Sequence, residues 1–396
     1  MRPSRMRSPK NSGERNSNMV GLLTLDSKIY NYGGFLQEMA LQDIIKSLGY
    51  ECEIIDYDVK QEFNTFSLKR GIENFSFEKI KKKLIKDKSI PLSSSVSALI
   101  VKRKKVFDEY REDNLLLSKK MSCNDLHSAN LPYKQLVCGS DQIWNPDYNI
   151  PSFFLNFGGK ECRRIIYAAS IGKDYLSRRQ EKIYSKLLEF PDYISVREES
   201  AQKLISNITE KNVKLVLDPT LLHQQEYWMK KADDSSLNHR NYIFCYFLNL
   251  TDEKVKSAND FARRNNCEII AIPYLHNEME EYSEELEGKL LSEVNPADFL
   301  NLIRNAETVI TDSFHAAVFS IIFQKDFWCF GRNAGTYNMN TRLHTLLGYV
   351  KMQDRLIEPG DLKNKMHCTH VDIDFRDLKI KQKESIAFLR NALEIL

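Results

Sequence analysis

His315 lies at the start of a segment whose pattern predicts a strand, a loop and a helix. Residues 309–310 are apolar and predict the end of a buried strand, and residues 316–323 have the apolar spacing of a helix. Asp312 and Ser313 between them are residue types that cap helix N-termini. A helix N-terminus attracts phosphate or carboxylate, and a histidine beside such an anion can hold, donate or accept a proton near neutral pH. The alternative is an ordinary capped helix whose histidine bonds a neighbour.

A second group of polar residues follows another predicted strand, at residues 136–138. Ligands of open α/β sheets bind outside the C-terminal ends of the strands. We therefore expect Asp141, Gln142 and Asn145 to face a crevice, with Trp144 as a wall. The alternative is an Asx-type turn that packs against the tryptophan.

Arg197 follows a third predicted strand, at residues 194–196, directly before a predicted helix. A guanidinium in this place can bind an anion with two parallel hydrogen bonds. The alternative is a local ion pair between Arg197 and Glu198 or Glu199.

A polar loop with two glycines, Asn31-Tyr32-Gly33-Gly34, follows the first predicted strand at Met19–Thr24. The loop lacks the G-x-G-x-x-G spacing of dinucleotide-binding loops. Glycine still allows the backbone to approach a ligand closely. We expect Asn31, Tyr32 and Gly33 to contact an acceptor molecule.

Two series of alternating strands and helices are separated by the polar residues 224–240. This pattern predicts an α/β fold with two Rossmann-like domains that face a cleft, the GT-B-like arrangement. The predicted domains are 19–235 and 236–396, with a basic helical insertion at about 60–120. Residues 1–18 are predicted to be disordered.

The insertion carries a run of lysines from Lys79 to Lys88, and a second helix is predicted from about Ala98 to Tyr110. One interpretation is two surface helices with a solvated basic face. The other is a patch for an anionic glycan or for peripheral contact with a membrane surface.

The composition excludes several classes of protein. A net charge of +3 argues against extensive nucleic-acid binding, and 42% hydrophobic residues allow a sizeable core. The eight cysteines lack zinc-like or redox spacing, which predicts reduced thiols in a cytosolic protein. No apolar run approaches the ~20 residues of a membrane span. We expect a cytoplasmic protein, with the inner face of the membrane as a further location if the lysine-rich helix binds there.

Six short motifs, in this order, resemble those of the polysaccharide pyruvyl transferase family over about residues 19–350. They are Asn31-Tyr-Gly-Gly-Phe-Leu-Gln37, Gly139-Ser-Asp-Gln-Ile-Trp-Asn145, Tyr167-Ala-Ala-Ser-Ile-Gly172, Ser195-Val-Arg-Glu198, Leu217-Asp-Pro-Thr220 and Thr311-Asp-Ser-Phe-His315. The resemblance implies a GT-B-like fold. It also implies transfer of a pyruvyl group from phosphoenolpyruvate to a sugar of a polysaccharide or of its lipid-linked precursor, with a ketal as product.

The resemblance implies that Arg197 binds the donor and that His315 is the site histidine of the C-terminal half. Many members carry Arg-Leu-His where this chain has Ser313-Phe314-His315. Our hypothesis is that Arg342 or Arg332 supplies the missing positive charge, and that the donor site includes all of these residues.

The reaction requires a proton for the methylene carbon of the donor and removal of a proton from a sugar hydroxyl. His315 is the candidate for the first task or for orienting the phosphate, and Asp141 or Asp312 is the candidate for the second. Phosphoenolpyruvate is a co-substrate, and no cofactor is expected. No metal is expected either, because the histidines lack ligand spacing.

Two other functions remain open at this stage. A nucleotide-sugar glycosyltransferase could use the same fold, but that class usually has a glutamate in the site helix, and here no acidic residue follows His315 before Asp326. A non-catalytic, glycan-binding relative is the second alternative. Galactose, mannose, N-acetylmannosamine and glucuronic acid all offer suitable hydroxyl pairs. The Lys79–Lys88 helix favours an anionic or lipid-linked acceptor.

Overall fold

We describe a computed structural model of the 396-residue chain. It describes residues 19–394 except 26–29, 58–61, 63–93, 129–130, 148–149, 274–284, 335–336, 339 and 369–370. The predicted disorder of residues 1–18 and the Lys79–Lys88 helix fall outside these ranges. Within them, no helix is long and apolar enough to cross a membrane.

The first half of the chain forms a parallel sheet of six described strands, in the order β2-β1-β3-β4-β5-β6. Its central strands β3 and β4 are almost completely buried because helices cover both faces. The chain order reverses direction between β1 and β3, where a ligand crevice is expected. The strands are β1 Met19–Leu23, β2 Glu51–Ile54, β3 Gln135–Gly139, β4 Arg163–Ala169, β5 Tyr193–Val196 and β6 Val213–Leu215.

The second half forms another parallel sheet, in the order β14-β11-β10-β7-β8-β9. When the strands are numbered along the chain and the sheet is read from β9, the order is 3-2-1-4-5-6, which is that of a Rossmann fold. The order reverses between β7 and β10. The strands are β7 Tyr242–Tyr246, β8 Glu268–Ala271, β9 Gly288–Leu290, β10 Thr308–Thr311, β11 Asp326–Phe330 and β14 Leu356–Ile357. The short strands β12 (Asn333–Ala334) and β13 (Tyr337–Asn338) form a separate antiparallel pair.

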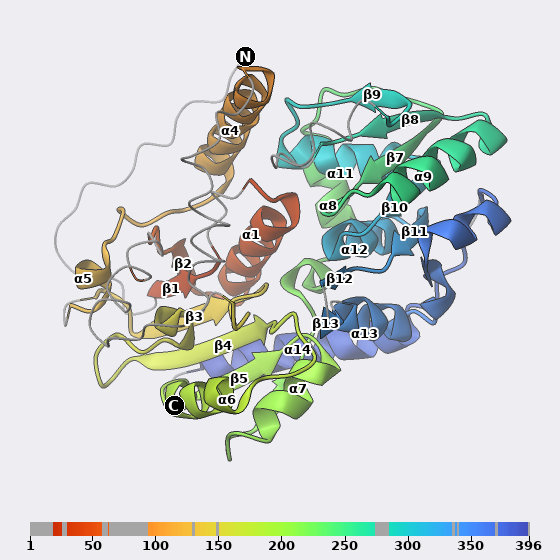
Figure 1. Cartoon of the computed structure of the whole chain (residues 1–396). Helices are drawn as coiled ribbons and strands as arrows, with labels where there is room; N and C mark the ends of the chain where they lie inside the picture. The colour runs from red at the N-terminus through yellow and green to blue at the C-terminus, as the bar shows by residue number, and fades with distance from the viewer. Residues whose placement is uncertain are drawn as a thin grey trace.

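Helices connect the strands and bring the two sheets together (Figure 1). The N-terminal lobe carries α1 Tyr32–Ser47, α4 Ser94–Asn114, α5 Cys123–Leu126, α6 Arg178–Leu187 and α7 Glu199–Ser206. The chain then continues through α8 Gln225–Ala232, α9 Asp252–Asn265, α11 Pro296–Asn305, α12 Phe314–Ile322, α13 Thr341–Tyr349 and α14 Arg376–Leu393. The predicted α/β fold with two facing Rossmann-like domains is confirmed.

The lobes contact each other through α1 of the first and α11 of the second. The Tyr32 ring stacks on Phe299 with centroids 4.7 Å apart, and its hydroxyl donates to the carbonyl of Val294 at 2.9 Å. The Arg103 guanidinium of α4 donates to the carbonyl of Pro273 at 2.7 Å and also reaches the second lobe. These contacts fix the relative position of the helix N-termini that surround the site.

Two predicted boundaries need correction. Residues 224–240 are not a linker throughout, because they include α8, which packs against α11. The C-terminal domain also does not extend to the chain end, because α14 returns to the first sheet. There Gln135 donates to the carbonyl of Leu393 at 2.5 Å, and Tyr167 lies beside Phe388. The predicted helix at Ala98–Tyr110 is confirmed and extends over all of α4.

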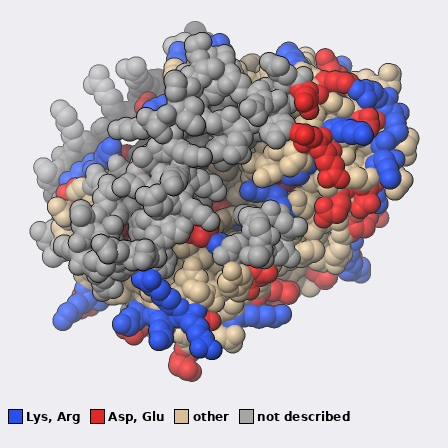
Figure 2. All heavy atoms as spheres, in the orientation of Figure 1, with Lys and Arg blue, Asp and Glu red and all other residues tan. Residues whose placement is uncertain are grey.

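Charges of both signs cover the described surface (Figure 2). Lysines and arginines gather along the lower edge of that view, where Figure 1 places α6 and α7, and acidic residues are more frequent over the second lobe. This mixture fits the small net charge of +3.

Candidate functional site

Strand ends of the first sheet converge on Arg197, which follows β5. The Arg197 guanidinium donates to Asp141, beyond β3, at 2.6 Å, and to Asp218, beyond β6. Its side chain is only 1% exposed. The alternative of a local ion pair with Glu198 or Glu199 is therefore replaced by two pairs that are distant in sequence.

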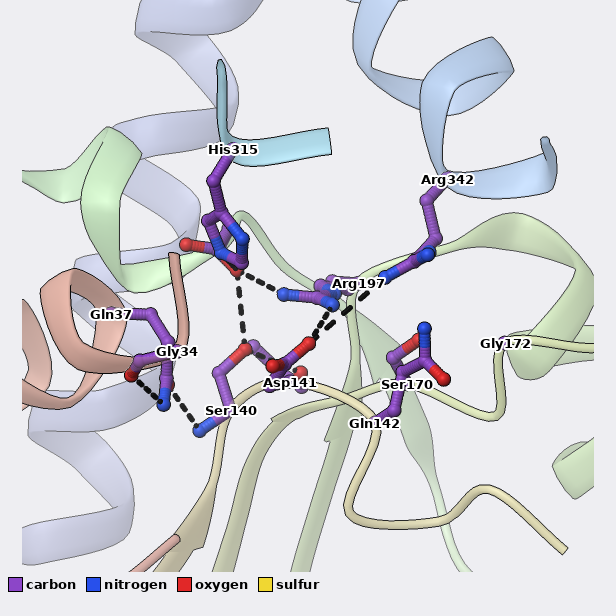
Figure 3. Close-up of polar contacts among 12 residues, drawn as sticks. Gly34, Gln37, Ser140, Asp141, Gln142, Ser170, Gly172, Arg197, His315 and Arg342 are labelled. Atoms are coloured by element: carbon purple, nitrogen blue, oxygen red, sulfur yellow. Dashed lines mark hydrogen bonds and ion pairs between the residues drawn. The ribbon is translucent and has the colours of Figure 1, made fainter. Parts of the chain in front are cut away.

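His315 enters the same space from the second lobe (Figure 3). It is the second residue of α12, whose N-cap is Ser313, so the predicted position in the first helical turn is confirmed. Its Nε2 lies 3.5 Å from Asp218 Oδ2, is buried, and has no hydrogen-bond partner among the described residues. The ring presses against α1 so closely that a Cβ added at Gly33 would lie 2.1 Å from its Nδ1.

Arg342 completes the group from the N-terminus of α13. It is buried, and its Nη1 lies 4.0 Å from Asp141 Oδ1. The amide of Gln142, in the orientation that satisfies its neighbours, accepts from both terminal nitrogens of Arg342 at 2.9 and 3.0 Å. The guanidinium carbons of Arg197 and Arg342 lie 4.7 and 5.6 Å from the ring centroid of Phe314. We call Asp141, Arg197, Asp218, His315 and Arg342 the Arg–His cluster.

The pKa values of the two arginines in this cluster shift in opposite directions. Burial would lower the pKa of Arg197, but the carboxylates of Asp141 and Asp218 outweigh it and raise the pKa above its ordinary value. For Arg342, burial and the like charge of Arg197 lower the pKa to about 10. Nearby carboxylates therefore balance the charge of Arg342 less well than that of Arg197.

The two carboxyl groups of the cluster are held in their charged form. Burial would raise the pKa of Asp141, but Arg197, His315 and Arg342 lower it below its ordinary value. Burial would also raise the pKa of Asp218, but Arg197 and His315 outweigh burial and lower it. Arg197 contributes the largest part of this lowering. Both side chains can therefore accept hydrogen bonds at neutral pH.

Glu198 supports the loop beside the cluster. Its Oε1 accepts from the Ser170 hydroxyl at 2.9 Å and from the backbone N–H groups of Ile171 and Gly172 at 3.0 and 3.3 Å. The Gly172 backbone has φ of +65°, and an added Cβ would meet Gln142 at 2.9 Å. Only glycine fits here, and the contact positions the amide that faces Arg342.

Three residues predicted to act in the site have other partners. The carboxylate of Asp312 accepts from the backbone N–H groups of Leu248 and Asn249 and from Lys254 Nζ at 2.8 Å. It joins β10 to the loop after β7, so we remove it as a candidate base. The hydroxyl of Ser313 caps α12 by accepting from Ala316 N at 3.4 Å. The side chain of Phe314 supports the two guanidinium groups rather than presenting a polar group.

Two of the six predicted acceptor residues lie in the core, and two others bind neighbouring backbone groups. Tyr32 is fully buried between the lobes, and Trp144 is fully buried, stacks on Phe154 and donates to the carbonyl of Phe153 at 3.1 Å. Both predictions are wrong because core packing occupies these rings. Asn31 caps α1 by accepting from Gly34 N at 3.0 Å, and Asn145 binds the backbone N–H of Asp147 at 3.0 Å.

Two further predicted residues border the cluster. Gly33 contacts His315, as described above, and Arg332 adds a positive charge that helps to lower the pKa of Arg342. The backbone N–H of Arg332 donates to Asn340 Oδ1 at 2.7 Å. The structure thus brings together Asp141, Gln142, Arg197, Phe314, His315 and Arg342.

Sequence reasoning missed Asp218, which the structure places at the centre. Its Oδ1 accepts from the backbone N–H and hydroxyl of Thr220 at 3.0 and 2.7 Å, while Oδ2 faces Arg197 and His315. The available signal was its position after a strand in the Leu217-Asp-Pro-Thr220 motif.

Residues 31–333 match the family described as polysaccharide pyruvyl transferase. The chain belongs to this family. The match spans every residue of the Arg–His cluster except Arg342. Comparison with curated proteins gives no match.

Several solved structures are similar to this family member. One is UDP-N-acetylglucosamine 2-epimerase from Rickettsia bellii, with 10% identity, coverage of 96% of this chain and 97% of that chain, and a TM-score of 0.48. Another is UDP-GlcNAc 2-epimerase from Methanocaldococcus jannaschii, with 11% identity, coverage of 91% and 98%, and a TM-score of 0.46. A third is the glycosyltransferase SnogD from Streptomyces nogalater, with 10% identity, coverage of 94% and 95%, and a TM-score of 0.41.

Proposed function

We propose that this transferase moves a pyruvyl group from phosphoenolpyruvate to two hydroxyls of one sugar, forming a ketal. The family match supports polysaccharide pyruvylation, and the Arg–His cluster supports the donor. The observation that carries the proposal is Arg342. It is a buried guanidinium at a helix N-terminus, its pKa is lowered to about 10, and the nearest described carboxylate oxygen lies 4.0 Å away.

A small dianionic donor suits this environment. Its phosphate or carboxylate would pair with Arg342 and with the free backbone N–H groups at the start of α12. Nε atoms of both Arg197 and Arg342, and Nε2 of His315, are buried without hydrogen-bond partners in the described part of the chain. Such donors are costly to leave unpaired, so a bound anion would stabilise all three. Arg342 would thus replace the arginine that many relatives carry at the position of Ser313.

The reaction delivers one proton to carbon, removes one proton from each of two hydroxyls, and releases one leaving group. His315 donates a proton to the methylene carbon of the donor while the first sugar hydroxyl adds to the adjacent carbon and loses its proton. Phosphate then leaves that carbon with the bonding electron pair, and the second hydroxyl replaces it and loses its own proton. One hydroxyl proton ends on the new methyl group and the other on the phosphate.

Asp141 is the proposed acceptor of the hydroxyl hydrogen bond. Its Oδ1 faces Arg197, and the carboxylate remains ionised at neutral pH because its pKa is lowered. Its side chain remains 13% exposed, whereas that of Asp312 is fully buried and fully engaged. This difference selects Asp141 over Asp312.

The test is to incubate the purified chain with phosphoenolpyruvate and a panel of galactose, mannose, N-acetylmannosamine and glucuronic acid glycans. We expect phosphate release together with the mass increase of a pyruvate ketal. We expect His315→Gln to lose turnover while it still binds phosphoenolpyruvate. Transfer from a nucleotide sugar, with no binding of phosphoenolpyruvate, would instead identify a glycosyltransferase and refute the proposal.

A further inference from the structure

A groove of about 640 Å³ lies between α7 of the first lobe and α13 of the second. Residues 199, 200, 203, 204 and 207 line it from α7 and its C-cap, and residues 341, 344, 345, 348 and 349 line it from α13. Each set has helical spacing of three or four residues, so each forms one continuous face. The lining on α7 extends over about 12 Å.

The walls of this groove lie next to residues of the site along the chain, although no residue of the Arg–His cluster itself lines the groove. Thr341 directly precedes Arg342, and Glu199 directly follows Glu198, so both walls start one residue from groups of the site. The backbone N–H of Glu199 donates to the Thr345 hydroxyl at 3.4 Å across the two lobes. The groove is open to solvent along its length, since Glu199, Lys203, Asn207 and His344 are exposed.

The lining is polar but nearly balanced in charge. Asp174 and Glu199 oppose Lys203, and His344 adds a titratable ring. The hydroxyls of Ser200 and Thr341 are buried without hydrogen-bond partners among the described residues. Tyr349 and Leu204 contribute half-buried apolar surface. Unpaired hydroxyls beside an aromatic ring suit a ligand that has both hydroxyl groups and apolar C–H faces.

We propose that this groove, the α7–α13 groove, binds the acceptor as an extended, uncharged saccharide whose terminal sugar reaches the Arg–His cluster. The proposal rests on the proposed function, because it assigns the second substrate of the same site. It replaces Tyr32 and Trp144 as acceptor contacts. It also favours a neutral glycan over the anionic acceptor suggested by the lysine-rich segment.

The test uses two neighbouring positions of the full chain. Asn207 lines the far end of the groove, whereas Ser206 is exposed and does not line it. Wild type, Asn207→Trp and the control Ser206→Trp are applied to immobilised mono-, di- and tetrasaccharides. These contain galactose, mannose or N-acetylmannosamine, with counterparts that contain glucuronic acid. Phosphoenolpyruvate binding is measured by calorimetry in the same preparations, and circular dichroism checks folding.

We expect the wild type to retain at least one neutral tetrasaccharide about tenfold more strongly than its monosaccharide. Asn207→Trp should remove this advantage, and Ser206→Trp should keep it. Equal retention by both variants, stronger retention of the acidic counterparts, or no retention of any saccharide would overturn the groove assignment. If the wild type retains saccharide but does not bind phosphoenolpyruvate, the proposed function is overturned and the groove assignment stands.

Discussion

The Arg–His cluster and the α7–α13 groove are adjacent but differ in burial and in charge. In the cluster, Arg197, Asp218 and Arg342 are buried, and ion pairs join Arg197 to Asp141 and to Asp218. In the groove, Lys203 and His344 are exposed, and no ion pair joins two lining residues among the described contacts. A buried, preorganised charge cluster suits one small anion, whereas an exposed polar groove suits a larger ligand with weaker individual contacts.

Because of this difference, we expect substitutions in the two regions to have different effects. A change in the cluster leaves a buried charge or displaces a reacting group, so it affects folding or turnover strongly. A change in the groove removes single hydrogen bonds to a solvated ligand, so it affects affinity weakly. The predictions below test this separation in order of expected effect.

The largest effect is expected for Asp218→Asn, because this change leaves the buried Arg197 with only one carboxylate partner. We expect the free energy of unfolding at neutral pH to fall by about 3–5 kcal/mol in urea titrations. The control is Asp147→Asn. Asp147 is 56% exposed and pairs with Lys173 at 2.7 Å. We expect this control to lose less than about 1 kcal/mol. Equal losses in the two variants would show that Asp218 contributes no more to stability than an exposed ion pair does.

Gly33→Ala is expected to have the next largest effect. The added Cβ would lie 2.1 Å from His315 Nδ1, so the imidazole must move. A misplaced catalytic group of this kind reduces kcat by about a hundredfold. Gly34→Ala is the matched control, because its Cβ would have ordinary contacts of 3.8 and 3.9 Å. Comparable kcat values for both variants would show that the position of His315 does not affect catalysis.

A pH effect is expected for donor binding. Burial and the charge of Arg197 lower the pKa of Arg342 to about 10. Only the protonated guanidinium binds an anion, so affinity for phosphoenolpyruvate is complete below this pKa and falls as pH rises through it. The decrease approaches about tenfold per pH unit above pH 10. Calorimetry at increasing pH should show this decrease in the wild type and not in Arg342→Ala.

The smallest effect is expected in the groove, for Thr341→Val. The change removes one buried, unpartnered hydroxyl without changing the size of the side chain. We expect the KM for the acceptor saccharide to rise about three- to tenfold, as for loss of one hydrogen bond. The affinity for phosphoenolpyruvate should stay unchanged. A larger effect on the donor than on the acceptor would contradict the separation of the two regions.

The sequence predicted most elements because their signals are local. The helix at Pro296–Asn305 shows such a local signal, a capping asparagine followed by an N-terminal proline. The strand and the capped helix around His315 were also predicted correctly. The course of α14 was not, because its apolar face does not reveal which lobe it covers.

The composition of the site was only partly predictable. Arg197 and Asp141 were each predicted to act at the end of a strand, and the carboxyl ends of parallel strands share one edge of the sheet, which explains why they meet. Trp144 packs on the nearby Phe154, whereas Tyr32 was misassigned because its burial depends on Phe299 of the opposite lobe, far away in sequence. Asp218 was missed for the same reason, since its importance arises only when β6 and α12 bring Arg197 and His315 together.

The most direct test of the central claim is calorimetric titration of phosphoenolpyruvate into the wild type and into Arg342→Ala. The account predicts binding of one donor per chain, with affinity reduced about ten- to hundredfold in the variant, as for loss of a charge-assisted hydrogen bond. A folded Arg342→Ala protein with unchanged affinity, or a folded wild type with no binding, would contradict it.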